Sequence, residues 1–307
     1  MGLLIGIDGG GTKTKCVLVD QELKILTSAE GGSSNPLSVG IEISASVIVN
    51  LIKRVLTFAK EIEIDAVVIG SAGAGRKKNA EDLKRAVFDL IFRERLSIPY
   101  IEVVSDAEIA IEGAFAGNIG AILIAGTGSI IFGKDKKGKI VRSGGFGKII
   151  GDEGGGYSIG RKGLSRAAKL LDGKYVKTTF VNLLRKNFGI DDLDSLILNV
   201  YSDKFDIAST ASLVIKAAGK GDKICKKILD EESDELLYYI KKFKQKFNQK
   251  TFKLCFCGGL LTTENYYSRM LRSKIKKNFN EIEFVKPTYP PEVGAVILAN
   301  KLLHKHK

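Results

Sequence analysis

Residues 3–20 read LLIGIDGGGTKTKCVLVD, and our prediction of the fold starts from this segment. Its first apolar run ends at Asp8, three glycines follow, and a second apolar run begins after Thr14. Glycine tolerates positive φ and lets a ligand approach the bare backbone. We therefore expect a strand, a sharp turn and a second strand, with successive backbone N–H groups that can bind an anion such as phosphate.

Two further turns share this composition: residues 126–129 read GTGS and residues 257–260 read CGGL. Each follows an apolar run, and hydroxyl side chains in the first of them add hydrogen-bond donors. An ordinary hairpin turn would explain one such loop on its own. The occurrence of three, each at the end of a buried strand, favours phosphate binding.

The rest of the chain alternates short apolar runs with helical periodicity. Helical spacing is present in 42–60, 80–95 and 107–116, and strand-like runs occupy 66–70 and 101–104. The same order restarts at Gly120, so we predict an α/β fold with parallel or mixed sheets covered by helices. We expect two related halves, residues 1–117 and residues 118–289, the second with a helical insertion. A last helix, 290–303, is expected to pack back on the first half.

The composition is that of a folded chain with two domains. The 307 residues are 44% hydrophobic and 27% charged, which excludes a disordered chain. Four cysteines in this length do not make a disulfide scaffold, so we expect buried thiols and a cytoplasmic protein. The net charge of +13 leaves nucleic acid, membranes and anionic small ligands open.

Two patterns argue against nucleic-acid and membrane partners. Residues 113–133 carry no charge, but their six glycines favour strand–turn–strand over a membrane helix. Residues 238–247 mix aromatic residues with lysines, yet Tyr239, Phe243 and Phe247 fall on one helical face. We predict a stripe of core residues there, with the lysines in solvent.

The sequence does not fix the oligomeric state, and a homodimer is one possibility.

Four acidic residues could serve phosphoryl transfer to a hydroxyl group, which needs a carboxylate near Mg²⁺ and a base beside the acceptor hydroxyl. Asp8 closes the first predicted strand, where it could orient water bound to Mg²⁺. Asp106 follows a predicted strand and begins a helix, so it is either a plain N-cap or a base at the carboxyl edge of a sheet. Asp152 and Glu153 lie in a glycine-rich loop that suits a ligand rich in hydroxyl groups.

These motifs resemble, in order along the chain, the family of N-acetylglucosamine kinases and BadF/BadG-type ATPases. Besides the three glycine turns, the resemblance rests on GGFG at 144–147, GDEG at 151–154 and PPEVGA at 290–295. The family belongs to the sugar kinase–Hsp70–actin superfamily. The resemblance implies two ribonuclease-H-like domains of the actin-like ATPase type, with a nucleotide cleft between them.

The resemblance also implies two sets of binding residues. The implied ATP-binding residues are Gly10, Gly11, Thr12, Lys13, Gly126, Thr127, Gly128, Gly258 and Gly259, with Ala208 as a weaker neighbour of the adenine. The implied sugar-binding residues are Asn35, Asp106, Ser129, Gly145, Phe146, Gly147 and Asp152. Turn initiation before Pro36 would equally explain Asn35, and Phe146 would equally suit a core position.

Two absences separate this chain from other branches of the superfamily. Residues 132–160 contain no cysteine, which argues against the iron–sulfur cluster of the related dehydratase activators. The Glu-x-Gly-His motif and the cysteine-rich zinc loop of ROK-type glucokinases are also missing.

We therefore predict an ATP-dependent kinase that phosphorylates the 6-hydroxyl of N-acetylglucosamine, a small-molecule amino sugar. Its cofactors would be ATP and Mg²⁺, with Asp106 as the catalytic base and Asp8 holding the metal through water. The alternatives are a kinase for glucosamine or N-acetylmuramic acid, and a non-kinase ATPase that acts on a partner protein.

Overall fold

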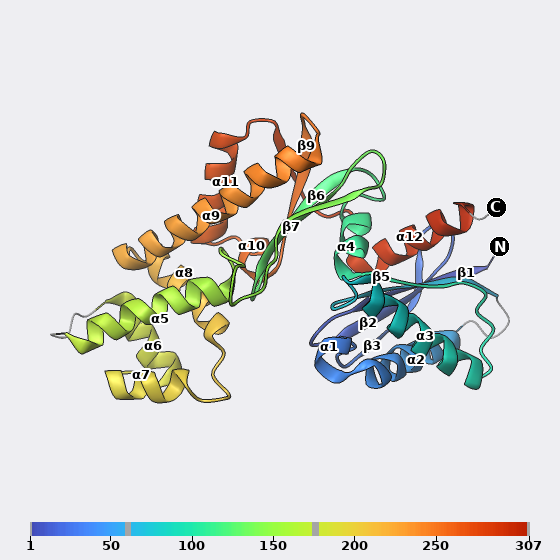
Figure 1. The fold of residues 1–307 in the computed structure, drawn as a ribbon, viewed down its shortest axis with the longest axis horizontal. Coiled ribbons are helices and arrows are strands. Elements are labelled where there is room, and N and C mark those ends of the chain that lie inside the picture. Colours follow the sequence, from blue (N-terminus) through green and yellow to red (C-terminus); the bar gives the residue numbers. More distant parts are fainter. Residues whose placement is uncertain (1, 59–62, 174–177, 306–307) are drawn as a thin grey trace. The chain divides into compact units, whose positions relative to one another are not determined.

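The computed structural model describes residues 2–58, 63–173 and 178–305, and these form two compact units (Figure 1). The first unit comprises Met1–Gly120 and Lys286–Lys307, and the second comprises Ala121–Val285. Each unit is built on its own five-stranded sheet of mixed direction with helices packed against it. The predicted α/β fold class is confirmed.

The first sheet has the strand order β3-β2-β1-β4-β5. Strand β2 is antiparallel to both β1 and β3, whereas β4 runs parallel to β1 and β5 runs parallel to β4. The strand bounds are β1 (Leu3–Gly9), β2 (Thr14–Val19), β3 (Ile25–Gly31), β4 (Ile64–Ser71) and β5 (Ile101–Ser105). Because β1, β4 and β5 are parallel, their carboxyl ends meet at one edge, and β1 and β5 bring Asp8 and Asp106 to it.

The two faces of this sheet carry separate cores because side chains alternate along each strand. Leu3, Ile5 and Ile7 pack with helices α2 and α3, whereas Leu4 packs on the other face with Ile109 and residues of α12. Figure 1 shows α2 and α3 on one face of this sheet and α4 and α12 on the other. The helices of the unit are α1 (Pro36–Val39), α2 (Ile41–Leu56), α3 (Lys77–Arg93), α4 (Asp106–Ala114) and α12 (Pro291–Lys305).

Helix α12 lies close against α4 and β1, and glycine makes this approach possible. A Cβ added to Gly294 would lie 1.9 Å from the carbonyl oxygen of Ile109 and 2.5 Å from the amide nitrogen of Gly113. A Cβ on Gly6 would lie 2.0 Å from the carbonyl oxygen of Glu292. The last helix therefore completes the core of the first unit.

The second sheet has the strand order β10-β9-β6-β7-β8. Strand β9 runs parallel to both β6 and β10, and β7 is antiparallel to β8. The bounds are β6 (Gly120–Ala125), β7 (Ser129–Lys134), β8 (Ile140–Gly144), β9 (Phe252–Cys257) and β10 (Ile282–Val285). The uncharged run 113–133 thus covers the end of α4 and the strands β6 and β7, as the strand–turn–strand prediction requires.

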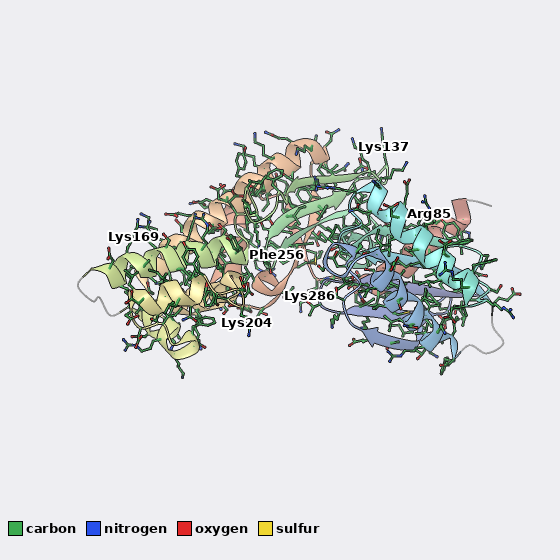
Figure 2. The ribbon with its side chains drawn as sticks, turned by 60° about the horizontal axis from the view of Figure 1, so that its bottom comes forward. Arg85, Lys137, Lys169, Lys204, Phe256 and Lys286 are labelled. Carbon is green, nitrogen blue, oxygen red and sulfur yellow. The ribbon has the colours of Figure 1, made fainter. Side chains whose placement is uncertain are left out.

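Helices supply most of the second unit and enclose one large core. They are α5 (Gly156–Asp172), α6 (Thr179–Phe188), α7 (Leu193–Val200), α8 (Ala211–Gly219), α9 (Lys223–Phe247), α10 (Gly259–Thr262) and α11 (Tyr266–Asn278), with a 3₁₀ turn at Ile207–Thr210. On α9, Tyr239, Phe243 and Phe247 are buried, so the predicted core stripe is confirmed. Figure 2 shows the side chains of both units, with the buried Phe256 and the exposed Lys137 labelled.

Over the described ranges, no helix combines the length and the apolar character that crossing a bilayer demands.

Candidate active site

The first glycine turn joins β1 to β2 and is held by hydrogen bonds at its base. The N–H of Gly10 donates to the carbonyl of Lys13 over 3.0 Å and closes the turn. The hydroxyl of Thr14 is buried, 2.7 Å from both the Gly32 carbonyl and the Ser34 hydroxyl. This leaves three exposed residues at the tip of the turn: Gly11, Thr12 and Lys13.

The tip of this turn fits a phosphate group. Among the described residues, no protein acceptor takes a hydrogen bond from the backbone N–H of Gly11, Thr12 or Lys13. The amide nitrogen of Asn35 lies 3.8 Å from the place where a Cβ on Gly11 would be, so a side-chain donor stands beside the same turn. Backbone N–H groups, a hydroxyl, an amide and a lysine are the donors that the predicted anion site would need.

Asp8 lies at the end of β1, opposite Lys15 of β2 and Gly70 of β4. Burial is the main cause that raises its pKa from 3.8 to about 6, followed by the negative charges of Glu292 and Asp106. The charges of Lys13 and Lys15 partly oppose this shift. A half-buried carboxylate with acidic neighbours gains strongly from a divalent cation, because the cation removes the repulsion that raises the pKa.

The donor set around Asp8 suits Mg²⁺ that keeps most of its water. Nowhere in residues 2–58, 63–173 and 178–305 do three Asp, Glu, His or Cys side chains gather into a metal cage. Mg²⁺ commonly uses only one or two carboxylates together with water and substrate phosphates. Asp8 therefore fits the water-mediated role that the sequence suggested.

Glu292 is a charged neighbour that the sequence reasoning did not single out. Its side chain is buried, and Oε1 lies 2.7 Å from Nζ of Lys15. This ion pair raises the pKa of Lys15, chiefly through the hydrogen bond to Glu292. The available signal was the PPE triplet, which places an acid in the first turn of the last helix.

The N-cap of α4 is Ser105 and not Asp106. The N–H of Glu108 donates to Oγ of Ser105 over 3.3 Å, and the Glu108 carboxylate accepts the N–H of Ser105 over 3.4 Å. This capping box disproves the plain-cap interpretation of Asp106, which is the first residue within the helix. Its carboxylate accepts a hydrogen bond of 2.9 Å from the N–H of Ala107.

The carboxylate of Asp106 is partly desolvated by its surroundings although its side chain is exposed. Burial raises its pKa above 3.8, and the hydrogen bond from Ala107 opposes the shift. A carboxylate with a raised pKa that is accessible from solvent suits proton transfer from a hydroxyl group. Asp106 also raises the pKa of Asp8, so the two carboxylates are near enough for their charges to interact.

Asn35 does initiate a turn, and it does more. Its Oδ1 accepts the N–H of Leu37 over 3.0 Å and caps the short helix α1. The amide nitrogen remains beside Gly11, as described above. Capping therefore occupies the oxygen of the amide and does not exclude a contact between its NH₂ group and a ligand.

In the second unit, the GTGS turn is joined to the start of α5. The carbonyl of Gly126 accepts the N–H of Gly156 over 2.7 Å, and that of Thr127 accepts the N–H of Tyr157 over 2.9 Å. Thr127 is exposed at the tip of the turn. A Cβ on Gly128 would lie 2.2 Å from Oδ2 of Asp152, so the GTGS turn lies directly against the acidic loop.

Asp152 connects that loop to the GGFG segment. Its backbone has a φ of 61°, in the left-handed region that non-glycine residues rarely adopt, and its Oδ1 accepts the N–H of Gly147 over 3.0 Å. Burial raises the pKa of Asp152, and hydrogen bonds from Gly147 and Phe146 oppose this. Phe146 is exposed, so it is not a core residue. Its ring lies edge-on to that of Tyr239, with 6.2 Å between the ring centroids. Gly145, with a φ of 70°, precedes it.

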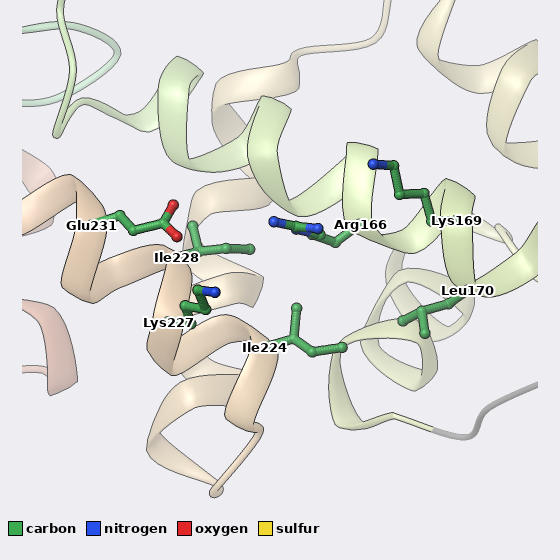
Figure 3. Close-up of a pocket in the computed structure, with 7 residues that line it drawn as sticks. All are labelled: Arg166, Lys169, Leu170, Ile224, Lys227, Ile228 and Glu231. Carbon is green, nitrogen blue, oxygen red and sulfur yellow. The ribbon is translucent and has the colours of Figure 1, made fainter.

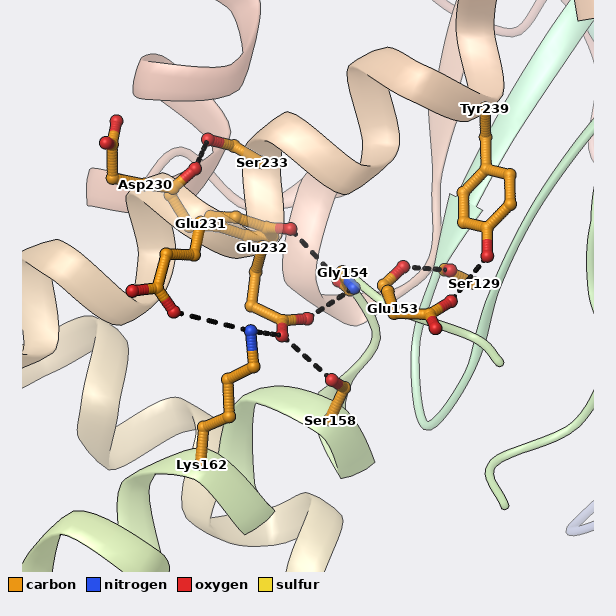
Figure 4. Close-up of polar contacts among 11 residues, drawn as sticks. Ser129, Glu153, Gly154, Ser158, Lys162, Asp230, Glu231, Glu232, Ser233 and Tyr239 are labelled. Carbon is orange, nitrogen blue, oxygen red and sulfur yellow. Dashed lines mark hydrogen bonds and ion pairs between the residues drawn. The ribbon is translucent and has the colours of Figure 1, made fainter. Parts of the chain in front are cut away.

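Ser129 has a different position from the one expected of a ligand contact. Its side chain is 3% exposed, and its hydroxyl donates to the backbone carbonyl of Glu153 (Figure 4). The hydroxyl therefore links β7 to the acidic loop in this structure.

A buried network behind the acidic loop was missed from the sequence (Figure 4). Glu232 of α9 is completely buried and accepts hydrogen bonds from the N–H of Gly154 and the hydroxyl of Ser158, and Lys162 lies 2.8 Å from it. The Glu153 carboxylate accepts the hydroxyl of Tyr239. The buried hydroxyl of Tyr267 donates to the carbonyl of Gly154 over 3.1 Å. The network holds the backbone of the loop from the core side.

The third glycine turn borders a pocket that could hold a nucleobase. Gly258 has a φ of 84°, and a Cβ there would lie 2.4 Å from the carbonyl oxygen of Ala125. The next residue, Gly259, lines a pocket of about 410 Å³ between α8 and α11. Its other lining residues are Ser212, Ile215, Lys216, Gly219, Leu260, Thr263, Asn265, Tyr266 and Arg269. Ala208 lies elsewhere, with its carbonyl oxygen 3.2 Å from where a Cβ on Gly156 would be.

Comparison with known proteins identifies relatives over almost the whole length. The model of the BadF/BadG/BcrA/BcrD ATPase family matches residues 5–299. An N-acetylmuramic acid/N-acetylglucosamine kinase of Clostridium acetobutylicum is 34% identical, covering 97% of this chain and 98% of the relative. An N-acetyl-D-glucosamine kinase of Dictyostelium discoideum is 31% identical, covering 97% of each.

A solved structure agrees in fold. The proposed N-acetylglucosamine kinase of Chromobacterium violaceum is 24% identical, with a TM-score of 0.74 over 97% of this chain and 99% of that one. The motifs, the two mixed sheets and the family match all lead to one assignment: this chain belongs to the BadF/BadG/BcrA/BcrD ATPase family.

Proposed function

We propose that this chain is an ATP-dependent kinase that transfers a phosphoryl group to the 6-hydroxyl of N-acetylglucosamine. The observation that carries the proposal is the state of Asp106. Ser105 performs the capping for α4, so the Asp106 carboxylate is left at the carboxyl edge of the first sheet with a raised pKa. A carboxylate in this state can accept the proton of a sugar hydroxyl as that oxygen attacks phosphorus.

The other residues of the proposal divide into two groups by chemistry. The exposed turns at Thr12 and Thr127 would bind phosphate oxygens, and the pocket beside Gly259 would bind the base of ATP. Mg²⁺ held by Asp8 through water would neutralise charge on the phosphates. The acidic loop would bind sugar hydroxyls through Asp152 and the backbone around Gly147.

The names of the relatives support an amino sugar as the acceptor. Two relatives more than 30% identical over 97% of this chain carry N-acetylglucosamine in their names. The second candidate is N-acetylmuramic acid, because the Clostridium relative is named for both sugars. A glucosamine kinase of Vibrio cholerae, 27% identical over 64% of this chain, supports glucosamine less strongly.

A coupled assay with a panel of sugars tests the proposal. ADP release should depend on N-acetylglucosamine, and phosphorus-coupled NMR of the product should place phosphate on O6. N-acetylmuramic acid and glucosamine are the competing acceptors. ATP hydrolysis without any sugar phosphate would favour the non-kinase ATPase, and phosphate on another hydroxyl would overturn the assignment of the position.

A further inference from the structure

A pocket between α5 and α9 takes no part in the proposed reaction (Figure 3). Its volume is about 270 Å³, which is room for roughly nine groups the size of a water molecule. Figure 3 shows the side chains of both helices converging on the space between them. The pocket is therefore large enough for a small organic ligand and too small for a nucleotide.

The mouth of this pocket is positively charged. Arg166 and Lys169 of α5 and Lys227 of α9 line it and are exposed. None of these three cations forms an ion pair with a carboxylate in the described part of the chain. The acid among the lining residues, Glu231, lies 3.5 Å from Lys162, which is outside the pocket. Three cations without carboxylate partners suit a dianionic head group.

The floor of the pocket is apolar. It consists of Leu170, Ile224 and Ile228, and Ile228 is 3% exposed. A sugar phosphate or a free phosphate would leave these aliphatic side chains facing polar groups. An alkyl or aryl body would instead bury them.

We propose that this pocket binds a small alkyl or aryl phosphate monoester. The apolar body covers Leu170, Ile224 and Ile228, and the phosphate oxygens take hydrogen bonds from Arg166 and Lys227. Arginine can bind two phosphate oxygens at once, which fixes the orientation of the head group.

The pocket is connected to the acidic loop through Lys162, one turn before Arg166 on α5, and through Glu231 and Glu232 on α9. Glu231 lines the pocket and pairs with Lys162, and Lys162 also pairs with Glu232, which accepts the N–H of Gly154. A bound dianion repels Glu231, so Lys162 then pairs with Glu232 alone and holds the loop more firmly. This second part of the proposal rests on the proposed function, since it assumes that the loop binds the sugar.

Isothermal titration of the full chain with octyl phosphate tests the binding site, with ADP present at saturation to occupy the nucleotide site. Octyl phosphate should bind with a stoichiometry of one, and inorganic phosphate and 1-octanol should each bind far more weakly. Arg166→Met and Lys227→Met keep the aliphatic stem of the side chain, and each should weaken binding about twofold to fivefold. Lys137→Met, on the β7–β8 hairpin, is the matched control and should bind like the wild type.

The heat of binding does not depend on kinase activity. The titration therefore tests the binding site independently of the proposed function. Equal affinity of wild type, Arg166→Met and Lys227→Met would overturn the site. Equal affinity for inorganic phosphate and octyl phosphate would overturn the role of the apolar floor.

Steady-state kinetics test the connection to the loop. Saturating octyl phosphate should lower the sugar KM about twofold to fivefold, which is the scale of one exposed ion pair, and Glu231→Gln should abolish the effect. An unchanged sugar KM in the wild type would overturn the connection. A chain that binds octyl phosphate but phosphorylates no amino sugar would overturn the proposed function and leave the binding site in place.

Discussion

At the residue scale, Asp8 carries a carboxylate whose ionisation is disfavoured by its surroundings at the end of β1. Burial and two acidic neighbours raise its pKa to about 6, so ionising this carboxyl costs more free energy in the folded protein than in the unfolded chain. Protein sites that bind cations often accept such a cost, because the ligand relieves it on binding. The proposed metal-binding role of Asp8 therefore predicts a cost in stability when no cation is bound.

The variant Asp8→Asn should be more stable than the wild type at neutral and alkaline pH. The pKa is 3.8 in the unfolded reference and about 6 in the fold, so the folded state holds the proton more tightly. Wild-type stability then falls as pH rises from about 4 to 6, and the loss is complete above that range. Chemical denaturation at pH 8 should show a gain on the order of 1–3 kcal/mol for Asp8→Asn, shrinking toward pH 4.

Asp89→Asn is the control for this prediction, because Asp89 is exposed on α3 of the same unit. It should differ little from the wild type at any pH in the series. A loss of stability in Asp8→Asn at pH 8 would contradict the origin assigned to the raised pKa.

At the scale of elements, the sequence predicts what depends on neighbouring residues and misses what depends on distant ones. The glycine turn after Asp8 was predictable because its strand, its glycines and its threonines are consecutive. The contact between Glu232 and Gly154 spans 78 positions, and nothing in the spacing of α9 distinguishes Glu232 from a surface acid. Ser105 was missed as a cap because Asp106, beside it, is an equally good capping residue.

Gly294→Ala tests the close approach of α12 to α4. Its Cβ would overlap backbone atoms of Ile109 and Gly113, and backbone cannot move as easily as a flexible side chain. We expect a loss of about 1–3 kcal/mol in unfolding free energy, in spite of the better helix propensity of alanine. Thermal and chemical unfolding measure it.

Gly32→Ala is the matched substitution, since a Cβ at Gly32 meets no atom within 4 Å. If Gly294→Ala and Gly32→Ala had the same free energy of unfolding, α12 and α4 would be able to move apart without loss of stability.

Glu232→Gln tests the network behind the acidic loop. The amide would present a donor toward Lys162 or Gly154, where the carboxylate accepts from both. Glu232 is a positioning residue in this account, so kcat/KM for the sugar should fall about tenfold to a hundredfold, while KM for ATP stays near the wild-type value. Glu283→Gln, exposed on β10, is the control.

An equal loss of affinity for sugar and ATP in Glu232→Gln would indicate general unfolding of the unit. That result would remove the specific link between Glu232 and the acidic loop.

At the scale of the whole molecule, the family assignment rests on motifs that are spread over both units. The excess of positive charge contributes little to it: the lysines of α9 lie outside the buried aromatic stripe. The cytoplasmic location and the homodimer stay predictions, as do the roles assigned to individual site residues. What the two units share is a glycine turn after a buried strand, with an acidic residue nearby.

The turnover of Asp106→Asn measures whether the Asp106 carboxylate acts as the catalytic base. Replacing the carboxylate by an amide removes the proton acceptor and keeps the size of the side chain. The Ser105 cap keeps α4 in place. N-acetylglucosamine should bind nearly as tightly as to the wild type in calorimetry, while kcat for sugar phosphate formation should fall roughly 10²–10⁴-fold. The exposed Asp89→Asn should keep full activity. A near-normal kcat in Asp106→Asn would contradict its role as the base.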